Sequence, residues 1–205
     1  MTTKERIVEE ALTLFSVKGF KGTSVKNIAD AVGIKDSSLY KHFKSKQEIL
    51  DSIVETMNLR LEKMSEHVGL PAGDDVDTAV TFYAGLDEEQ LVAFSKKIFL
   101  FYLKDSFVSR FWRMGTIEQY SNPAVYAVYS RLFLEESIRY QTELFAAMVK
   151  AKVLKEADPG VLAMSFYAPI YFLLSKYSMH PEKEEEALQV LERQVREFFR
   201  IYGRE

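Results

Sequence analysis

Apolar residues recur at spacings of three and four along most of this chain, and that periodicity limits the fold more than any other feature. In the final segment Leu188, Leu191, Val195, Phe198 and Tyr202 follow at intervals of three, four, three and four. This spacing places side chains on one face of an α-helix. No run of alternating apolar and polar residues, which would indicate a β-strand, competes with it. The sequence therefore predicts an all-α fold.

The periodicity lapses between residues 67 and 75, where the run HVGLPAGDD gathers glycine and proline. Such a run is typical of a boundary between domains. We expect an N-terminal domain over residues 1–50, a linker helix over 46–66, and a second helical domain over 67–205. In the second domain the predicted helices are 75–85, 87–104, 105–114, 123–152, 159–178 and 182–202.

Charge divides the chain near the same place. Residues 1–50 hold 9 Lys and Arg against 6 Asp and Glu, whereas the remainder holds 18 against 24. The local excess comes from the following lysines: Lys18, Lys21, Lys26, Lys35, Lys41, Lys44 and Lys46. A cluster of this kind can bind the phosphate groups of a nucleic acid. On charge alone, an ordinary solvated surface explains it better.

The spacing of short helices in the N-terminal domain supports the nucleic-acid interpretation. A first helix ends at Gly19, Thr23 or Ser24 caps a second helix that Gly33 stops, and a third helix follows over residues 36–43. Two short helices joined by a glycine turn and packed on a longer one describe a helix-turn-helix. In that motif the last helix enters the major groove of DNA.

Short polar and cationic groups gather on the outer face of the predicted third helix. Ser37, Ser38, Lys41 and His42, with Tyr40 at the flank, can reach base edges and phosphates. A capping box then opens the long linker helix, and Lys46 in its first turn is either a second phosphate contact or a free surface lysine.

The run from Arg6 to Leu50 resembles the DNA-binding domain of the TetR family of bacterial transcriptional regulators. The resemblance rests on the following elements: Ala11, Leu14 and Phe15 before Gly19-Phe20; Gly22-Thr23-Ser24; Ile28-Ala29; Val32-Gly33-Ile34; and Leu39 to Phe43 followed by Lys44-Ser45-Lys46. It implies a homodimer that binds a pseudo-palindromic double-stranded DNA operator and carries a helical C-terminal domain for a small-molecule effector.

The resemblance also implies roles for individual positions. Backbone contacts are expected from Thr23, Ser24, Tyr40, His42 and Lys46. Sequence recognition is expected from Lys35, Asp36, Ser37, Ser38 and Lys41, and Lys26 belongs to the same basic surface.

Asp36 is unusual at the tip of a helix that recognises DNA. An aspartate there can cap the helix, or it can accept a hydrogen bond from cytosine N4 and so select a base. We expect the cap.

The second domain is rich in aromatic residues, and several carry hydroxyl groups that need partners when buried. We expect some of them to line a mostly apolar cavity for a lipophilic or aromatic effector. The candidates are Phe99, Tyr102, Phe107, Phe111, Tyr126, Tyr129, Phe133, Tyr167 and Tyr171. Pro169 removes the helical hydrogen bond to the carbonyl of Ser165, which either opens a pocket by kinking the helix or adjusts packing.

The apolar seam of the final segment suits a helix-helix interface. A monomer can bury such a seam internally, and the pattern alone does not choose. The resemblance favours a homodimer, with Leu188, Leu191, Val195, Phe198 and Tyr202 at its interface, because a symmetric operator calls for a two-fold protein.

Other classes of function find little support. The chain has no cysteine, no histidine cluster at metal-ligand spacing and no catalytic motif. We therefore expect no metal, no cofactor and no enzyme activity. Charges within the first ten residues argue against a signal peptide, and no stretch suits a membrane span, so we expect a cytoplasmic protein. The predicted function is transcriptional repression relieved by the effector; the alternatives are an activator, or a helical ligand-binding protein that does not bind DNA.

Overall fold

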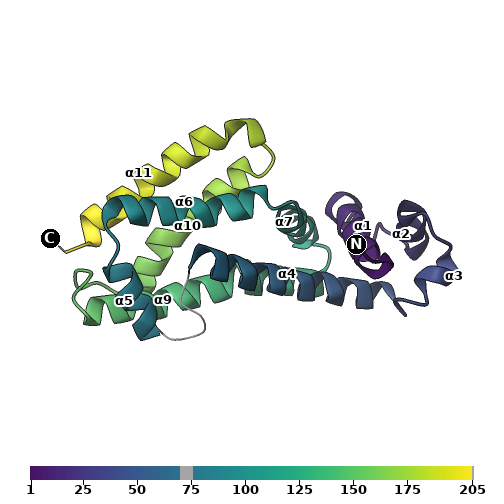
Figure 1. The fold of residues 1–205 in the computed structure, drawn as a ribbon, viewed down its shortest axis with the longest axis horizontal. Coiled ribbons are helices and arrows are strands. Elements are labelled where there is room, and N and C mark those ends of the chain that lie inside the picture. The colour runs from purple at the N-terminus through teal and green to yellow at the C-terminus, as the bar shows by residue number, and fades with distance from the viewer. Residues whose placement is uncertain (70–75, 205) are drawn as a thin grey trace. The chain divides into compact units, whose positions relative to one another are not determined.

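The computed structural model describes residues 1–69 and 76–204. Among these residues the regular secondary structure is helical, apart from one isolated antiparallel bridge between Leu154 and Gly203. The all-α prediction is confirmed. The helices are α1 (Thr3–Lys18), α2 (Val25–Val32), α3 (Asp36–Leu39), α4 (Lys46–Val68), α5 (Val76–Ala84), α6 (Glu88–Lys104), α7 (Ser106–Glu118), α8 (Pro123–Ser130), α9 (Glu136–Lys150), α10 (Pro159–Tyr177) and α11 (Glu184–Tyr202), with a π-helical turn η1 (Arg131–Glu135) and a 3₁₀ turn η2 (Pro181–Lys183) (Figure 1).

The chain forms two compact units, each built from two separate segments. Unit 1 contains Met1–Glu62 and Asp105–Arg131, and unit 2 contains Lys63–Lys104 and Leu132–Glu205. The first segment of unit 1 contains the predicted N-terminal domain over residues 1–50 and most of the predicted linker helix. The second segment differs from the predicted division, because residues 105–131 pack with the N-terminal helices and not with the rest of 67–205.

In unit 1, α7 covers the apolar face of α1. Burial of Leu12 and Phe15 on α1 and of Phe107 and Phe111 on α7 forms this core and explains why α7 belongs here. Helix α8 approaches α7 so closely that a Cβ on Gly115 would lie 2.2 Å from a ring carbon of Tyr129. Glycine is therefore required at that position.

Local signals fix the boundaries of the short helices. Ser24, and not Thr23, caps α2 by accepting from the backbone N–H of Asn27 at 3.1 Å. Gly33 ends the helix in the left-handed conformation, with φ of 77°, as a turn of this type requires. Regular α-helix in α3 ends at Leu39, four residues earlier than predicted, although irregular turns continue as far as His42.

Unit 2 packs α10 against both α9 and α11, and α11 also lies along α6 (Figure 1). The predicted interface seam of the last helix faces this core: Leu191, Val195 and Phe198 are at most 3% exposed. The prediction that these three residues form a dimer interface is therefore wrong, because the chain buries them itself. Leu188 and Tyr202 are half-buried in the same unit.

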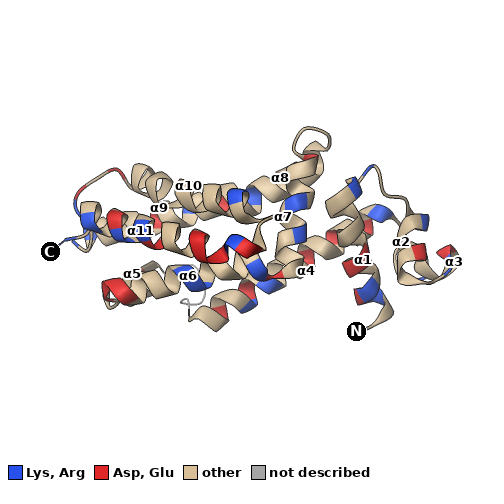
Figure 2. Ribbon diagram, turned by 90° about the horizontal axis from the view of Figure 1, so that it is seen from above, with Lys and Arg blue, Asp and Glu red and all other residues tan. Residues whose placement is uncertain are grey.

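Figure 2 marks acidic and basic residues along α11 and α6, and several of them form ion pairs between the two helices. Arg196 contacts Glu88 at 2.6 Å and Glu89 at 2.7 Å, and Lys96 of α6 reaches Glu192 at 2.6 Å. These ion pairs fix the orientation of α11 on α6 more than they stabilise it, since exposed pairs contribute little.

Two irregularities interrupt the long helices of the second half of the chain. The helix predicted over 123–152 is divided by the π-helical turn η1. Pro169 lies inside α10, and the carbonyl of Ser165 that it leaves without a helical partner accepts from Nε2 of Gln194 at 3.3 Å. The freed carbonyl is thus satisfied from α11, and Pro169 also lines an open groove between these two helices.

Candidate nucleic-acid interface and ligand cavity

The end of unit 1 formed by α2, α3 and the turns after α3 presents the predicted DNA-binding side chains. Buried Leu39 and Phe43 anchor this segment to the core. The outward positions are exposed: Ser24, Lys26, Lys35, Asp36, Ser37, Tyr40, Lys41 and His42, while Ser38 is half-buried. Asp36 is the first residue of α3 and makes no capping hydrogen bond. The expectation that it caps the helix is therefore wrong, and its carboxylate remains exposed.

Two residues predicted to contact phosphate, Thr23 and Lys46, make hydrogen bonds within unit 1. Thr23 is 1% exposed and donates to the carbonyl of Gly19 at 2.9 Å. Nζ of Lys46 donates to the carbonyls of Phe20 at 2.5 Å and Thr23 at 2.8 Å, and it lies 4.3 Å from the centre of the Phe20 ring. Burial lowers the pKa of Lys46, and the charge of Glu118 opposes that shift. The side chain of Thr23 is thus unavailable to DNA, and Lys46 ties the α1–α2 loop to α4.

A buried carboxylate that sequence reasoning missed supports the same loop. Glu118, at the end of α7, is 2% exposed and accepts from the backbone N–H of Phe20 at 2.5 Å and from Oγ of Ser121 at 2.8 Å. Gly19 makes room for it, because a Cβ there would lie 2.7 Å from Oε1. Nothing in the sequence around residue 118 signals this contact, since the partners are about a hundred residues apart.

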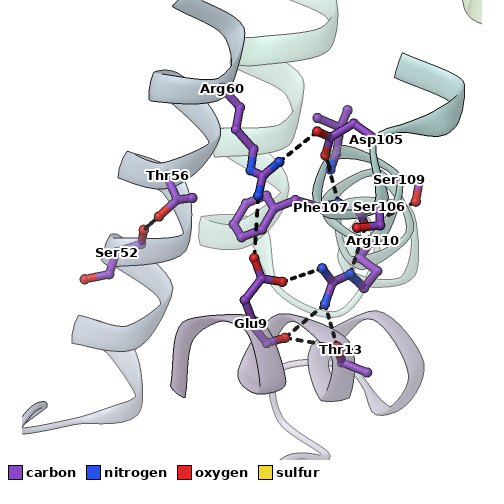
Figure 3. A network of polar contacts seen from close by, with 11 residues as sticks. Glu9, Thr13, Ser52, Thr56, Arg60, Asp105, Ser106, Phe107, Ser109 and Arg110 are labelled. Atoms are coloured by element: carbon purple, nitrogen blue, oxygen red, sulfur yellow. Dashed lines mark hydrogen bonds and ion pairs between the residues drawn. The ribbon is translucent and has the colours of Figure 1, made fainter. Parts of the chain in front are cut away.

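A second polar network joins α1, α4 and α7 (Figure 3). Arg110 pairs with Glu9 at 2.5 Å and donates to Oγ1 of Thr13 at 2.6 Å. Arg60 lies 3.6 Å from Glu9 and 2.7 Å from Asp105, which also caps α7. With Glu118, this network fixes α7 to the helix that supports the helix-turn-helix.

Unit 2 contains a cavity of about 220 Å³. Its lining comes from α6 (Leu91, Phe94, Ser95, Ile98, Phe99, Tyr102), α9 (Ser137, Tyr140, Gln141, Leu144, Phe145, Met148) and α10 (Phe166, Tyr167, Ile170, Leu174), with Met64, Tyr83 and Phe199. Among these described residues none is charged. The wall is therefore apolar, with a few hydroxyl groups and one carboxamide.

Three of the nine aromatic residues predicted to line a pocket do so: Phe99, Tyr102 and Tyr167. The other six are absent from the lining of this cavity. Phe107, Phe111 and Tyr129 are buried in unit 1, which also contains Tyr126, while Phe133 is buried in unit 2 and Tyr171 is half-buried there. Sequence reasoning grouped Phe107 and Phe111 with the C-terminal helices, whereas α7, which carries them, packs against α1 in unit 1.

The tyrosine hydroxyls of the cavity are held in the neutral form. Burial raises the pKa of Tyr167 to about 12 and raises the pKa of Tyr102 and Tyr83 further. The hydroxyl of Tyr167 donates to the main-chain carbonyl of Phe133 in η1. Tyr83 and Tyr140 are hydrogen-bonded to each other.

The part of the chain that the structure describes offers no group of three or more His, Asp or Glu side chains that could hold a metal ion. Over residues 1–69 and 76–204, no helix combines the length and the apolarity needed to cross a bilayer.

A family model for bacterial regulatory proteins of the tetR family matches residues 7–53. Over 51 residues the chain is 49% identical to IcaR of Staphylococcus aureus strain Newman, the HTH-type negative transcriptional regulator of the biofilm operon icaADBC. That match covers 25% of this chain and 27% of IcaR, so the chain matches about a quarter of the length of this relative.

Solved structures resemble the chain over nearly its whole length. The flavonoid-responsive regulator FrrA has a TM-score of 0.64 at 23% identity and covers 98% of this chain and 97% of its own. The SmeT–triclosan complex has a TM-score of 0.68 at 21% identity and covers 100% and 93%. At such identities the likeness shows the fold alone. Residues 7–53 thus match the tetR family of bacterial regulatory proteins, and the chain as a whole shares the fold of these two regulators.

Proposed function

We propose that this protein is a transcriptional repressor that binds a pseudo-palindromic operator as a homodimer and releases it when a small, uncharged, mostly apolar effector occupies the cavity of unit 2. The observation that carries the proposal is the exposed set of side chains on α2, α3 and the following turns. The 49% identity to a negative regulator over this region supports repression.

Three exposed cations, Lys26, Lys35 and Lys41, provide the phosphate attraction that any DNA-binding surface needs. Ser37 and Asp36 supply a hydroxyl and a carboxylate for base edges. Since Asp36 makes no cap, its carboxylate is free to accept from cytosine N4. Lys46 and Thr23 contribute indirectly, by holding the loop that positions α2.

We assign the dimer contact to α10 in place of the buried seam of α11. On α10, Val161, Met164, Ala168 and Phe172 follow at intervals of three, four and four and are all exposed, and Met179 continues the row just beyond the helix. Phe172 is 62% exposed. A continuous apolar row of this kind on one helix suits a copy of itself across a two-fold axis.

The path of the chain supports coupling between the two units. The chain passes between the units three times, at residues 62–63, 104–105 and 131–132. Each passage lies close in sequence to the cavity lining: Met64 and Tyr102 line it, and Phe133 accepts a hydrogen bond from Tyr167, which also lines it. We infer that these three segments have two arrangements in equilibrium. A ligand that binds one arrangement more tightly shifts this equilibrium, and the size of the shift is set by its difference in affinity for the two.

Selection of bound duplexes from a random pool tests the proposal. At about 0.15 M salt, where weak nonspecific binding is suppressed, we expect enrichment of an inverted repeat. The variant Lys41→Ala should enrich the repeat less strongly, whereas Lys97→Ala, which changes an exposed lysine of α6 in unit 2, should enrich it as the parent protein does. If the folded protein enriches no sequence, the alternative of a ligand-binding protein without DNA binding replaces this proposal. Transcription assays with the selected operator then distinguish a repressor from an activator.

A further inference from the structure

Gln141 is the polar group of the cavity that the fold leaves unsatisfied. Its carboxamide oxygen is buried and accepts no hydrogen bond from any residue that the structure describes, although the residue lines the cavity. Folded proteins pair nearly all buried polar atoms, so this oxygen can accept a hydrogen bond from a molecule outside the chain.

The neighbours of Gln141 on α9 show why no protein group satisfies it. Ser137, one turn earlier, donates to the carbonyl of Leu132 at 3.4 Å. Leu144 and Phe145, one turn later, lie on the same side of the helix and are apolar. Another donor of the cavity, the hydroxyl of Tyr167, is engaged by the carbonyl of Phe133. The terminal torsion of a glutamine side chain is soft, so its carboxamide can turn the oxygen toward a ligand.

The lining also limits the charge and the size of that ligand. A carboxylate would lie in an apolar cavity with no cation among the described lining residues, and a cation would find only neutral phenols, because burial raises the tyrosine pKa values. The volume of about 220 Å³ exceeds the ~150 Å³ of a cavity known to admit benzene. A molecule of one or two rings therefore fits.

We propose that the cavity binds an uncharged, mostly apolar ligand of one or two rings whose O–H or N–H group donates a hydrogen bond to the carboxamide oxygen of Gln141. Gln141 is thus a specificity-determining residue that separates donors from ligands of equal shape without a donor. This inference rests on the proposed function, because the same cavity serves there as the effector site.

A matched pair of probes tests the assignment directly. 2-Naphthol carries a donor, and 2-methoxynaphthalene has the same ring system without one. Calorimetric titration of the full-length protein without DNA should give naphthol at least about a tenfold higher affinity than the ether, as one hydrogen bond to a buried acceptor provides. The charged 2-naphthoate should bind more weakly than either.

The variant Gln141→Leu removes the acceptor and keeps the approximate volume. We expect it to lower naphthol affinity about tenfold and to leave the affinity for the ether unchanged or higher, so that the preference disappears. Gln189→Leu, an exposed position on α11, is the matched control and should keep the preference. An unchanged thermal midpoint for Gln141→Leu verifies that the variant is folded.

Equal affinity for naphthol and ether, a preference that survives Gln141→Leu, or failure of both probes to bind would overturn the assignment. The proposed function is tested separately by adding naphthol to the protein on its selected operator. If naphthol binds through Gln141 but leaves operator affinity unchanged, the regulatory proposal fails and the ligand assignment stands.

Discussion

The helix-turn-helix face of unit 1 and the cavity of unit 2 have opposite chemistry. The first is exposed and polar, carries lysines, and is drawn from one continuous stretch between Ser24 and His42. The second is a cavity without charged lining residues, and its walls come from six helices between Met64 and Phe199. The difference suits the proposed function, because lysines attract the phosphates of DNA whereas an uncharged apolar cavity favours a neutral small molecule.

The largest effect is expected from disrupting the exposed apolar row of α10, which we assign to the dimer contact. Phe172→Glu places a charge on the exposed face of α10 and should dissociate the dimer. Losing simultaneous contact with two half-sites should weaken operator binding by about 100-fold or more. Analytical ultracentrifugation gives the oligomeric state, and anisotropy with the selected duplex gives the affinity.

Tyr120→Glu, at a 92% exposed position in unit 1, is the matched control and should leave the oligomeric state unchanged. A Phe172→Glu protein that remains dimeric and binds DNA normally would place the interface elsewhere.

Removing the buried carboxylate of Glu118 tests whether α7 supports the DNA-binding end of unit 1. Glu118→Ala leaves the N–H of Phe20 without its acceptor and should lower the free energy of unfolding of this unit by about 2–3 kcal/mol. Hydrogen exchange at the Phe20 amide should accelerate. Glu118→Gln, which keeps one acceptor, should recover part of the loss, and exposed Glu156→Ala should cost less than about 0.5 kcal/mol. Equal exchange at Phe20 in Glu118→Ala and in the parent protein would contradict this role.

A substitution of Lys41 tests whether this residue contacts phosphate or a base on the proposed DNA-binding surface. Lys41→Ala should weaken operator binding about tenfold and, if its contact is to phosphate, reduce the slope of log affinity against log salt by about 1. Anisotropy at several salt concentrations measures both, with Lys97→Ala as the control. Loss of affinity on one operator sequence only, with an unchanged salt slope, would assign Lys41 to a base instead.

The smallest expected effect is the response of unit 2 to alkaline pH. The pKa of Tyr167 is raised from about 10 to about 12, so between these values the unfolded chain loses a proton that the folded chain keeps. Stability from this group is present below pH 10 and is lost as the pH rises toward 12. Tyr167→Phe should give a shallower decline in denaturation midpoint over that interval, and an equally steep decline would show that Tyr167 contributes nothing to it.

The two regions also differ in how far the sequence could predict them. Helix α2, the glycine turn and the exposed lysines follow from local signals such as Ser24 and Gly33, which act within a few residues. Only contacts with distant parts of the chain show that Thr23 is buried and that Lys46 is engaged by the α1–α2 loop. The cavity depends on such contacts throughout, so Phe107 and Phe111 were placed in it although α7 packs on α1. No local sequence pattern marks Gln141 as a ligand contact, because only the folded structure shows that its carboxamide oxygen has no hydrogen-bond partner among the described residues.

The central claim, that two copies of this chain recognise one symmetric operator, is tested most directly by titrating the selected inverted repeat, a single half-site and a scrambled duplex with the protein. The account predicts two chains per inverted repeat, an affinity about 100-fold or more above that for the half-site, and a steep fall of affinity with salt. Equal affinity for all three duplexes, with the protein folded, would contradict it.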